Sequence, residues 1–150
     1  MRAYRLTRSK YPAFSGRGSL LANGRWHRAG VPAVYCAESR ALAVLEALVH
    51  TRKDQIPSDY VFFELDIDDS AVRTLSTSEM PTDWRASEPE GARTLGTEWI
   101  NSRSSIGLVV PSVVIPEERN LLLNAGHPDF VLRVKILGTQ LFVWDPRLFH

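Results

Sequence analysis

The sequence predicts an α+β domain in which a mainly antiparallel sheet is combined with a few helices. Short apolar or alternating segments typical of strands recur along the chain, whereas only two segments have the length and composition of a helix. The 150 residues, of which 44% are hydrophobic, suffice to bury one core, and no repeat or linker divides them. We therefore expect one domain that spans residues 1–150.

The first third of the chain combines two strands, a long loop and a helix. Met1–Leu6 alternates in polarity, which predicts the first strand. Residues 11–32 contain six glycines and prolines and form an irregular loop, and ordered loops of this length in a compact domain are usually functional. A short buried strand over Ala33–Cys36 follows. Ser39 then caps a helix over Arg40–His50, which is rich in strong helix formers.

The rest of the chain contributes mostly strands. Short strands are predicted over Val61–Ile67, Val72–Leu75, Leu108–Val110, Val113–Ile115 and Leu121–Leu123. The third and fourth of these belong to one strand that bends at Pro111-Ser112, and a helix over Thr94–Arg103 precedes it. Phe130–Leu137 and Gln140–Trp144 are expected to pair as a hairpin that turns at Gly138-Thr139.

The composition excludes several classes of protein. The single cysteine, Cys36, rules out an internal disulfide framework and a cysteine-based zinc site. The N-terminal residues lack the apolar segment of a signal peptide, and no segment is apolar enough to span a bilayer. We therefore expect a cytoplasmic protein that makes no contact with a membrane.

Charge is distributed unevenly along the chain. Residues 1–37 carry seven arginines and lysines and no acidic side chain, although the net charge of the whole chain is only +1. A basic segment beside an acidic body favours an anionic ligand near the N-terminal part of the protein, but a solvated basic surface has the same composition.

Glu46 is the most informative single residue. All other residues of Ala41–Val49 are apolar, so the predicted helix would be apolar all round and buried on most sides. Burial of an unpaired carboxylate is costly, so Glu46 should be paired, protonated or in contact with a polar cavity. A catalytic carboxylate and a carboxylate that reaches water through a gap are both open interpretations.

Three further side chains have the chemistry of a ligand site. Arg25 follows Gly24 in a glycine-containing loop, where a guanidinium fork is suited to phosphate oxygens, although a surface arginine in a turn is the simpler interpretation. Tyr35 offers a ring face or a hydroxyl group, but core packing accounts for it equally well. Ser112 interrupts an apolar run, where its hydroxyl either binds a ligand or satisfies a bend in the strand.

Together these residues resemble the RES domain family. The resemblance is carried by Gly24-Arg25-Trp26, Val34–Ser39, Ala41–Glu46, Val110-Pro111-Ser112 and the run from Glu118 to Asp129. The family is named for an arginine, a glutamate and a serine, which correspond here to Arg25, Glu46 and Ser112. Two positions depart from the family pattern: His27 occupies the place of an asparagine, and Asn124-Ala125-Gly126 replaces Asn-Pro.

The resemblance implies an ADP-ribosyltransferase-like fold around an NAD cleft. It also implies an enzyme that cleaves the nicotinamide–ribose bond of NAD by hydrolysis, by phosphorolysis or by ADP-ribosyl transfer. Glu46 would stabilise the oxocarbenium-like ribose and Arg25 would neutralise the pyrophosphate. Tyr35 and Ser112 would orient the substrate. Trp26 and Arg28 are further candidates for contact with NAD, which is a substrate, so neither a cofactor nor a metal is expected.

The same resemblance implies the toxin of a bacterial toxin–antitoxin pair. The expected partner is an Xre-like helix-turn-helix antitoxin, the complex is compatible with a homodimer of the toxin, and no direct binding of nucleic acid is expected. Two rival functions are retained. An mRNA-cleaving toxin would use the basic N-terminal segment to hold RNA, and a non-catalytic module would bind an acidic protein and would not need Glu46.

Overall fold

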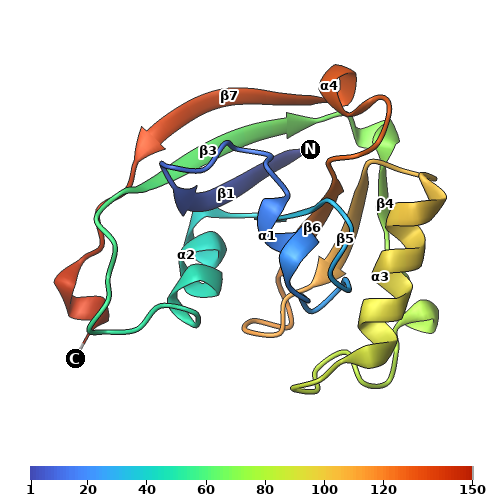
Figure 1. The fold of residues 1–150 in the computed structure, drawn as a ribbon, viewed down its shortest axis with the longest axis horizontal. Coiled ribbons are helices and arrows are strands. Elements are labelled where there is room, and N and C mark those ends of the chain that lie inside the picture. The colour runs from blue at the N-terminus through green and yellow to red at the C-terminus, as the bar shows by residue number, and fades with distance from the viewer. Residues whose placement is uncertain (150) are drawn as a thin grey trace.

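The computed structural model describes residues 1–149, which form a curled seven-stranded sheet and four α-helices (Figure 1). The strand order is β4-β5-β6-β2-β1-β3-β7. All neighbouring strands are antiparallel except β4 and β5, which are parallel. The predicted α+β class with a mainly antiparallel sheet is therefore confirmed.

Most predicted strands and both longer helices are present, with ends that differ by a few residues. The strands are β1 (Arg2–Arg8), β2 (Ala33–Ala37), β3 (Tyr60–Ile67), β4 (Val72–Thr74), β5 (Gly107–Pro111), β6 (Arg119–Asn124) and β7 (Val134–Leu141). The helices are α1 (Arg17–Leu21), α2 (Arg40–Leu48), α3 (Glu90–Ser102) and α4 (Phe130–Arg133). Helix α1 lies inside the segment predicted as a continuous irregular loop, and α3 begins four residues before its predicted start.

The predicted C-terminal hairpin is wrong. Residues Val134–Leu141 form the single strand β7, and Phe130–Arg133 form the one-turn helix α4. Strand β7 pairs with β3 along its whole length, and the register shifts between Glu64 and Leu65, opposite Gly138. The glycine that suggested a turn is therefore accommodated at an irregularity within the strand.

The predicted strand over Val113–Ile115 is also absent. The Ser112 hydroxyl accepts hydrogen bonds from the backbone N–H groups of Val114 and Ile115, at 3.1 and 3.0 Å. This local bonding closes a turn directly after β5, because a serine side chain offers the backbone an alternative to sheet pairing.

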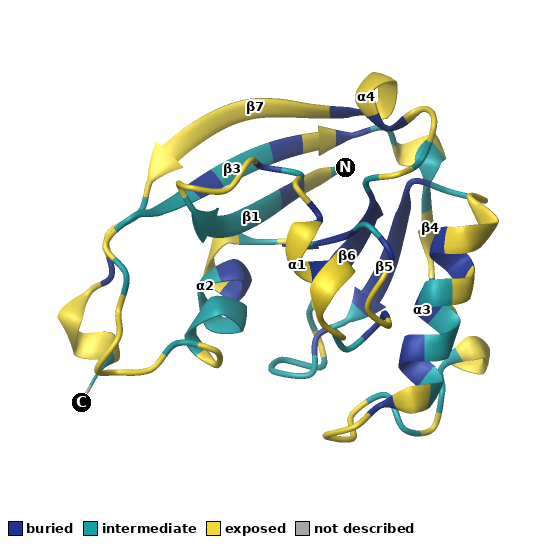
Figure 2. Ribbon diagram, in the orientation of Figure 1, coloured by how far each residue is buried: buried dark blue, intermediate teal, exposed yellow. Residues whose placement is uncertain are grey.

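Buried residues are concentrated in the central strands and on one side of α3 (Figure 2), and they form three clusters. One core cluster combines residues of β1 and β3 with residues of β2, β5 and β6, so the two halves of the sheet curl around it. A second cluster lies between α3 and strands β5 and β6, and a third joins α2 to β3. No helix in residues 1–149 has the length and apolar character needed to cross a membrane.

The two halves of the sheet diverge between β1 and β2. These strands share one registered pair, Tyr4 with Ala37, whereas β1 pairs with β3 over seven positions. The guanidinium of Arg5 spans the gap and donates a 3.0 Å hydrogen bond to the carbonyl oxygen of Tyr35. The divergence separates the half of the sheet formed by β1, β3 and β7 from the half formed by β2, β6, β5 and β4.

Candidate active site

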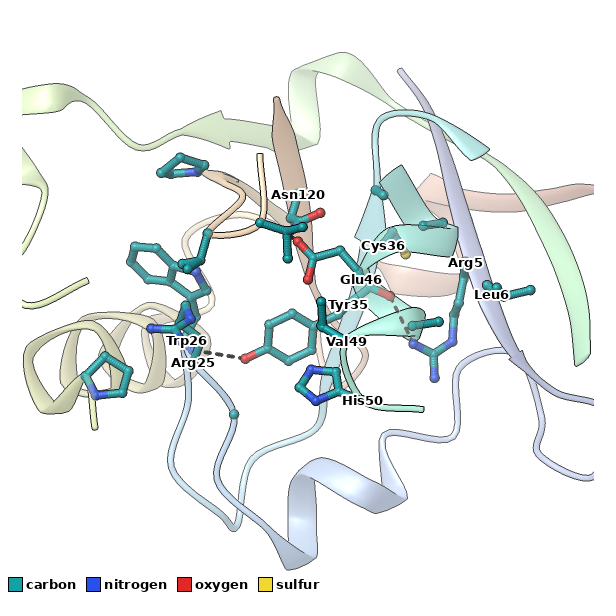
Figure 3. A pocket seen from close by; sticks show the side chains of 18 of the residues that line it. Arg5, Leu6, Arg25, Trp26, Tyr35, Cys36, Glu46, Val49, His50 and Asn120 are labelled. Carbon is teal, nitrogen blue, oxygen red and sulfur yellow. Dashed lines mark hydrogen bonds between the residues drawn. The ribbon is translucent and has the colours of Figure 1, made fainter. Parts of the chain in front are cut away.

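A cleft of about 750 Å³ lies where β1 and β2 diverge. Strands β1 and β2, helix α2, residues 23–26, and segments that precede α3 and follow β5 line it (Figure 3). Small-molecule sites typically have volumes of about 300–1,000 Å³. Of the residues singled out in the sequence, Arg25, Trp26, Tyr35 and Glu46 line the cleft.

Helix α2 brings Glu46 to the cleft. The predicted cap is confirmed, because the Ser39 hydroxyl accepts a 3.1 Å hydrogen bond from the N–H of Leu42. The prediction that this helix is buried on most sides is wrong. Only Leu42 and Ala43 are buried, because the helix packs on one side against β1 and β3. The half-buried Glu46 lines the cleft and accepts hydrogen bonds from two side chains, so its carboxylate has the polar partners expected of it.

Two hydrogen bonds fix the Glu46 carboxylate. The Ser112 hydroxyl donates to Glu46 Oε1 at 2.7 Å, and the Asn120 side-chain amide donates to the same oxygen at 2.6 Å. These donors come from the segment after β5 and from β6, which are more than 60 residues away in the chain. With Oε1 held by both donors, Oε2 is available to a ligand in the cleft.

Ser112 lies behind Glu46, outside the set of residues that line the cleft. It has no exposed surface, and its oxygen bonds Glu46 as well as two backbone N–H groups. Its position is that of a support for the carboxylate.

Tyr35, which also lines the cleft, belongs to a second hydrogen-bonded unit. His27 Nε2 lies 2.9 Å from the carbonyl oxygen of Ala22, which only accepts, so Nε2 carries the proton. Its Nδ1 then accepts from the Tyr35 hydroxyl at 2.7 Å, and that hydroxyl accepts from the N–H of Trp26 at 3.1 Å. Burial lowers the pKa of His27 and raises the pKa of Tyr35, so both groups are held neutral near neutral pH.

Gly24 makes this unit possible. A Cβ atom at Gly24 would lie 2.5 Å from the His27 ring and 2.6 Å from the Tyr35 hydroxyl. His27 stands where the family pattern has asparagine. Its ring bonds the Tyr35 hydroxyl in space that Gly24 leaves free.

Arg25 holds a loop at the edge of the cleft. Its Nη1 donates to the carbonyl oxygens of Trp84 and Ala86, at 2.9 and 2.7 Å. Both carbonyls belong to residues 81–89, here termed the 81–89 loop, of which Ser87 and Pro89 line the cleft. Arg25 therefore positions the wall of the cleft in addition to lining it.

Trp26 and Arg28 lie differently from Arg25. The Trp26 side chain is 2% exposed and belongs to the core cluster beneath α3, although it also reaches the cleft wall. Arg28 is exposed, forms an ion pair with Glu90 at 3.0 Å and lies outside the cleft.

Arg5 was not singled out from the sequence, although it lines the cleft. Its Nε is buried without a hydrogen-bond partner, and no acidic side chain within residues 1–149 forms an ion pair with it. Burial lowers its pKa, since the charged form is poorly solvated there. Its neighbours Arg2 and Arg8 on the same strand pair with Glu64 and Asp59 at 2.8 Å. Strand alternation places Arg5 on the same face of β1 as the buried Ala3 and opposite to Arg2 and Arg8, and this is the signal in the sequence that could have identified it.

Asn120 was the second omission. It was quoted within the resemblance but received no role, because the sequence gives no indication that β6 passes beside α2. Among the described residues, no cluster of three or more histidine, cysteine, aspartate or glutamate side chains is arranged to hold a metal ion.

Comparison with known proteins gives consistent matches over nearly the whole chain. The family model described as RES domain matches residues 2–145. A Toxin Res from Photorhabdus laumondii is 43% identical over 97% of this chain and 95% of the relative. A Prs ADP-ribosylating toxin from Sphingobium sp. is 37% identical over 89% of this chain and 85% of the relative.

A solved structure has the same fold. The crystal structure of the M. tuberculosis MbcT–MbcA toxin–antitoxin complex includes a chain that matches with a TM-score of 0.76 and 20% identity. The match covers 95% of the present chain and 84% of the matched chain.

Proposed function

The chain belongs to the RES domain family, and we propose that it is the toxin of a toxin–antitoxin pair that cleaves the nicotinamide–ribose bond of NAD. The observation that carries this proposal is the Glu46 carboxylate, held at the cleft by Ser112 and Asn120. The ADP-ribosylating activity named for the Sphingobium relative supports NAD as the substrate.

The proposed reaction needs one well-oriented carboxylate. Nicotinamide departs as a neutral base from a positively charged nitrogen, so positive charge develops on the ribose as the bond stretches. Glu46 Oε2 would face this charge or accept a hydrogen bond from the ribose 2′-hydroxyl, interactions that grow stronger in the transition state. Because Ser112 and Asn120 fix Oε1, the carboxylate needs little rearrangement during the reaction.

The cationic side chains of the cleft would bind the pyrophosphate. Arg5 has the stronger claim, because its guanidinium is partly buried and lacks an acidic partner in residues 1–149. Arg25 keeps Nη1 on the 81–89 loop and would offer its remaining N–H groups. The Tyr35 ring would pack on the nicotinamide or ribose, and Trp26 would support that wall of the cleft. NAD acts as substrate in this scheme, and no cofactor or metal has a part in it.

An antitoxin partner follows from the same family membership and from the complex in which the MbcT fold was solved. We propose an Xre-like helix-turn-helix protein as that partner, a toxin homodimer within the complex, and the cytoplasm as the site of action. An inhibitor of this kind is needed because unrestrained loss of NAD would kill the producing cell.

RNA cleavage has less support than NAD cleavage. Sequence-specific RNA binders commonly stack bases on exposed aromatic side chains, and the indole of Trp26 is 2% exposed. The two activities are separated by incubating the protein with NAD and with RNA and following both substrates. Release of nicotinamide with intact RNA is the expected result, whereas RNA cleavage with intact NAD would overturn the proposal. Stability of both substrates would favour the non-catalytic binding module.

A further inference from the structure

His50 lies one helical turn after Glu46 and lines the same cleft. Its backbone N–H bonds the carbonyl oxygen of Ala47 at 3.2 Å, so the helical path of α2 continues to this residue. Residues four apart in a helix lie on the same face. In the view of Figure 3 the Glu46 carboxylate and the His50 ring lie on either side of the Tyr35 ring, and all three residues line the cleft. The histidine is exposed, and its ring forms no hydrogen bond with residues 1–149.

Few other groups of the cleft can accept a proton. Arginines carry their protons at neutral pH, and burial raises the pKa of Tyr35 above its ordinary value. Burial also raises the pKa of Cys36 to about 12 and keeps its thiol unreactive. The Glu46 carboxylate is committed to Ser112 and Asn120 and is needed beside the ribose. Imidazole is the side chain that most often serves as a base near neutral pH.

We propose that His50 is the general base that deprotonates the water molecule that attacks the ribose of NAD, a role that rests on the proposed function. The assignment names water as the acceptor and hydrolysis as the reaction. One residue would then stabilise the ribose cation while its neighbour on the next helical turn activates the nucleophile.

The step conserves atoms and charge. The oxygen of water bonds to C1′ of the ribose, and its proton passes to a ring nitrogen of His50. The bond from C1′ to the nicotinamide nitrogen breaks, and its electron pair stays on nicotinamide, which leaves neutral. The exposed imidazolium then releases the proton to solvent, and neither an oxidant nor a reductant takes part.

The inference is tested with His50→Ala in phosphate-free buffer, followed by addition of azide. Loss of a general base typically lowers the rate about 10²–10⁴-fold, so kcat should fall to that extent while KM for NAD is nearly unchanged. Azide carries no proton to remove and therefore does not need the base. It should restore turnover of the variant and yield a ribosyl azide product. Lys53→Ala removes an exposed cation just beyond the helix and should leave both constants and the azide response as in the unmodified protein.

The possible failures are distinguishable. Turnover of NAD by His50→Ala at the unmodified rate would overturn the role of His50 and leave the proposed function intact. A fall in kcat that azide does not restore would also overturn it, because the histidine would then act only through structure. Turnover of NAD by the unmodified protein only after phosphate is added would overturn the role of His50, because water would not be the acceptor. Absence of NAD turnover by the unmodified protein with and without phosphate would instead remove the proposed function on which the role rests.

Discussion

The Glu46 carboxylate depends on donors that a helix alone does not supply. Ser112 and Asn120 both donate to Oε1. Ser112 follows β5 and Asn120 belongs to β6, so both come from segments distant from α2 in the sequence. Ser112 is buried behind the carboxylate and Asn120 holds the same oxygen from the cleft wall, so the two contacts orient Glu46 for the substrate.

Replacement of Ser112 by alanine should weaken both structure and turnover. The change removes one donor to Glu46 and leaves the N–H groups of Val114 and Ile115 without their acceptor. A buried group left unpaired costs about 1–3 kcal/mol, so we expect the free energy of unfolding in urea to fall by that amount. NAD turnover should decline less than on loss of Glu46, since Asn120 still holds the carboxylate. The exposed Ser58, changed to alanine, is the matched control, and equal stability of the two variants would contradict the assigned role of Ser112.

Arg5 should contribute to binding without contributing much to stability. Arg5→Met removes one hydrogen bond to the Tyr35 carbonyl, worth about 1 kcal/mol, but also relieves a poorly solvated charge. We expect the unfolding free energy to change by less than about 1 kcal/mol, while KM for NAD rises at least about tenfold, because a pyrophosphate loses its cationic partner. Arg8→Met, on the same strand but paired with Asp59, should leave KM unchanged. A KM for Arg5→Met that matches the control would exclude Arg5 from substrate binding.

Two arginines hold the 81–89 loop at the edge of the cleft. Arg25 bonds the carbonyls of Trp84 and Ala86, and Arg93 pairs with Glu88 and donates to the carbonyl of Gly24. The loop is thereby tied to the segment that carries Arg25.

Removal of the Arg25 contacts should loosen this loop. The exposed Arg85 lies between the two carbonyls that Arg25 bonds, and trypsin cleaves after arginine. In Arg25→Ala, cleavage after Arg85 should be several-fold faster because local opening becomes easier. Cleavage in the exposed Arg52-Lys53 segment provides an internal reference, and Arg17→Ala is the control variant. Equal cleavage rates after Arg85 in the two variants would refute the tether.

Helix α3 packs backbone to backbone on the other side of the same segment. A Cβ atom at Gly96 would lie 1.7 Å from the Trp26 carbonyl oxygen. Gly96→Ala should therefore lower the unfolding free energy by at least about 1–3 kcal/mol, although alanine favours helices by about 1 kcal/mol over glycine. Gly18→Ala in α1 meets nothing within 4 Å and should be neutral or slightly stabilising. Urea denaturation of both variants measures the difference, and a stable Gly96→Ala would mean that α3 can move away from Trp26.

Across the whole molecule, local patterns predicted local structure well. The composition of residues 40–48 and the cap at Ser39 identified α2, and apolar alternation located most strands. The failures arose where distant contacts decide. Strand β7 stays continuous through Gly138 because it pairs with β3, and the chain turns after Ser112 because a hydroxyl bonds the backbone.

The residues of the candidate site likewise divide into one that its local sequence identified and others that depend on distant contacts. Glu46 was identified because a carboxylate in an apolar segment is exceptional whatever the fold. Arg5 and Asn120 were missed because their significance depends on the divergence of β1 from β2 and on the passage of β6 beside α2. Neither of these strand arrangements can be recognised from the sequence around Arg5 or Asn120.

The role of Glu46 in NAD cleavage is tested most directly by nicotinamide release from Glu46→Gln beside Glu38→Gln. Both changes are isosteric, but Glu38 is exposed, lies outside the cleft and accepts a hydrogen bond from the N–H of Arg119, which glutamine can also accept. We predict that Glu46→Gln melts at the temperature of the unmodified protein and releases nicotinamide at least about 10²-fold more slowly, while Glu38→Gln retains full activity. Release of nicotinamide by Glu46→Gln at the unmodified rate would contradict the proposed mechanism.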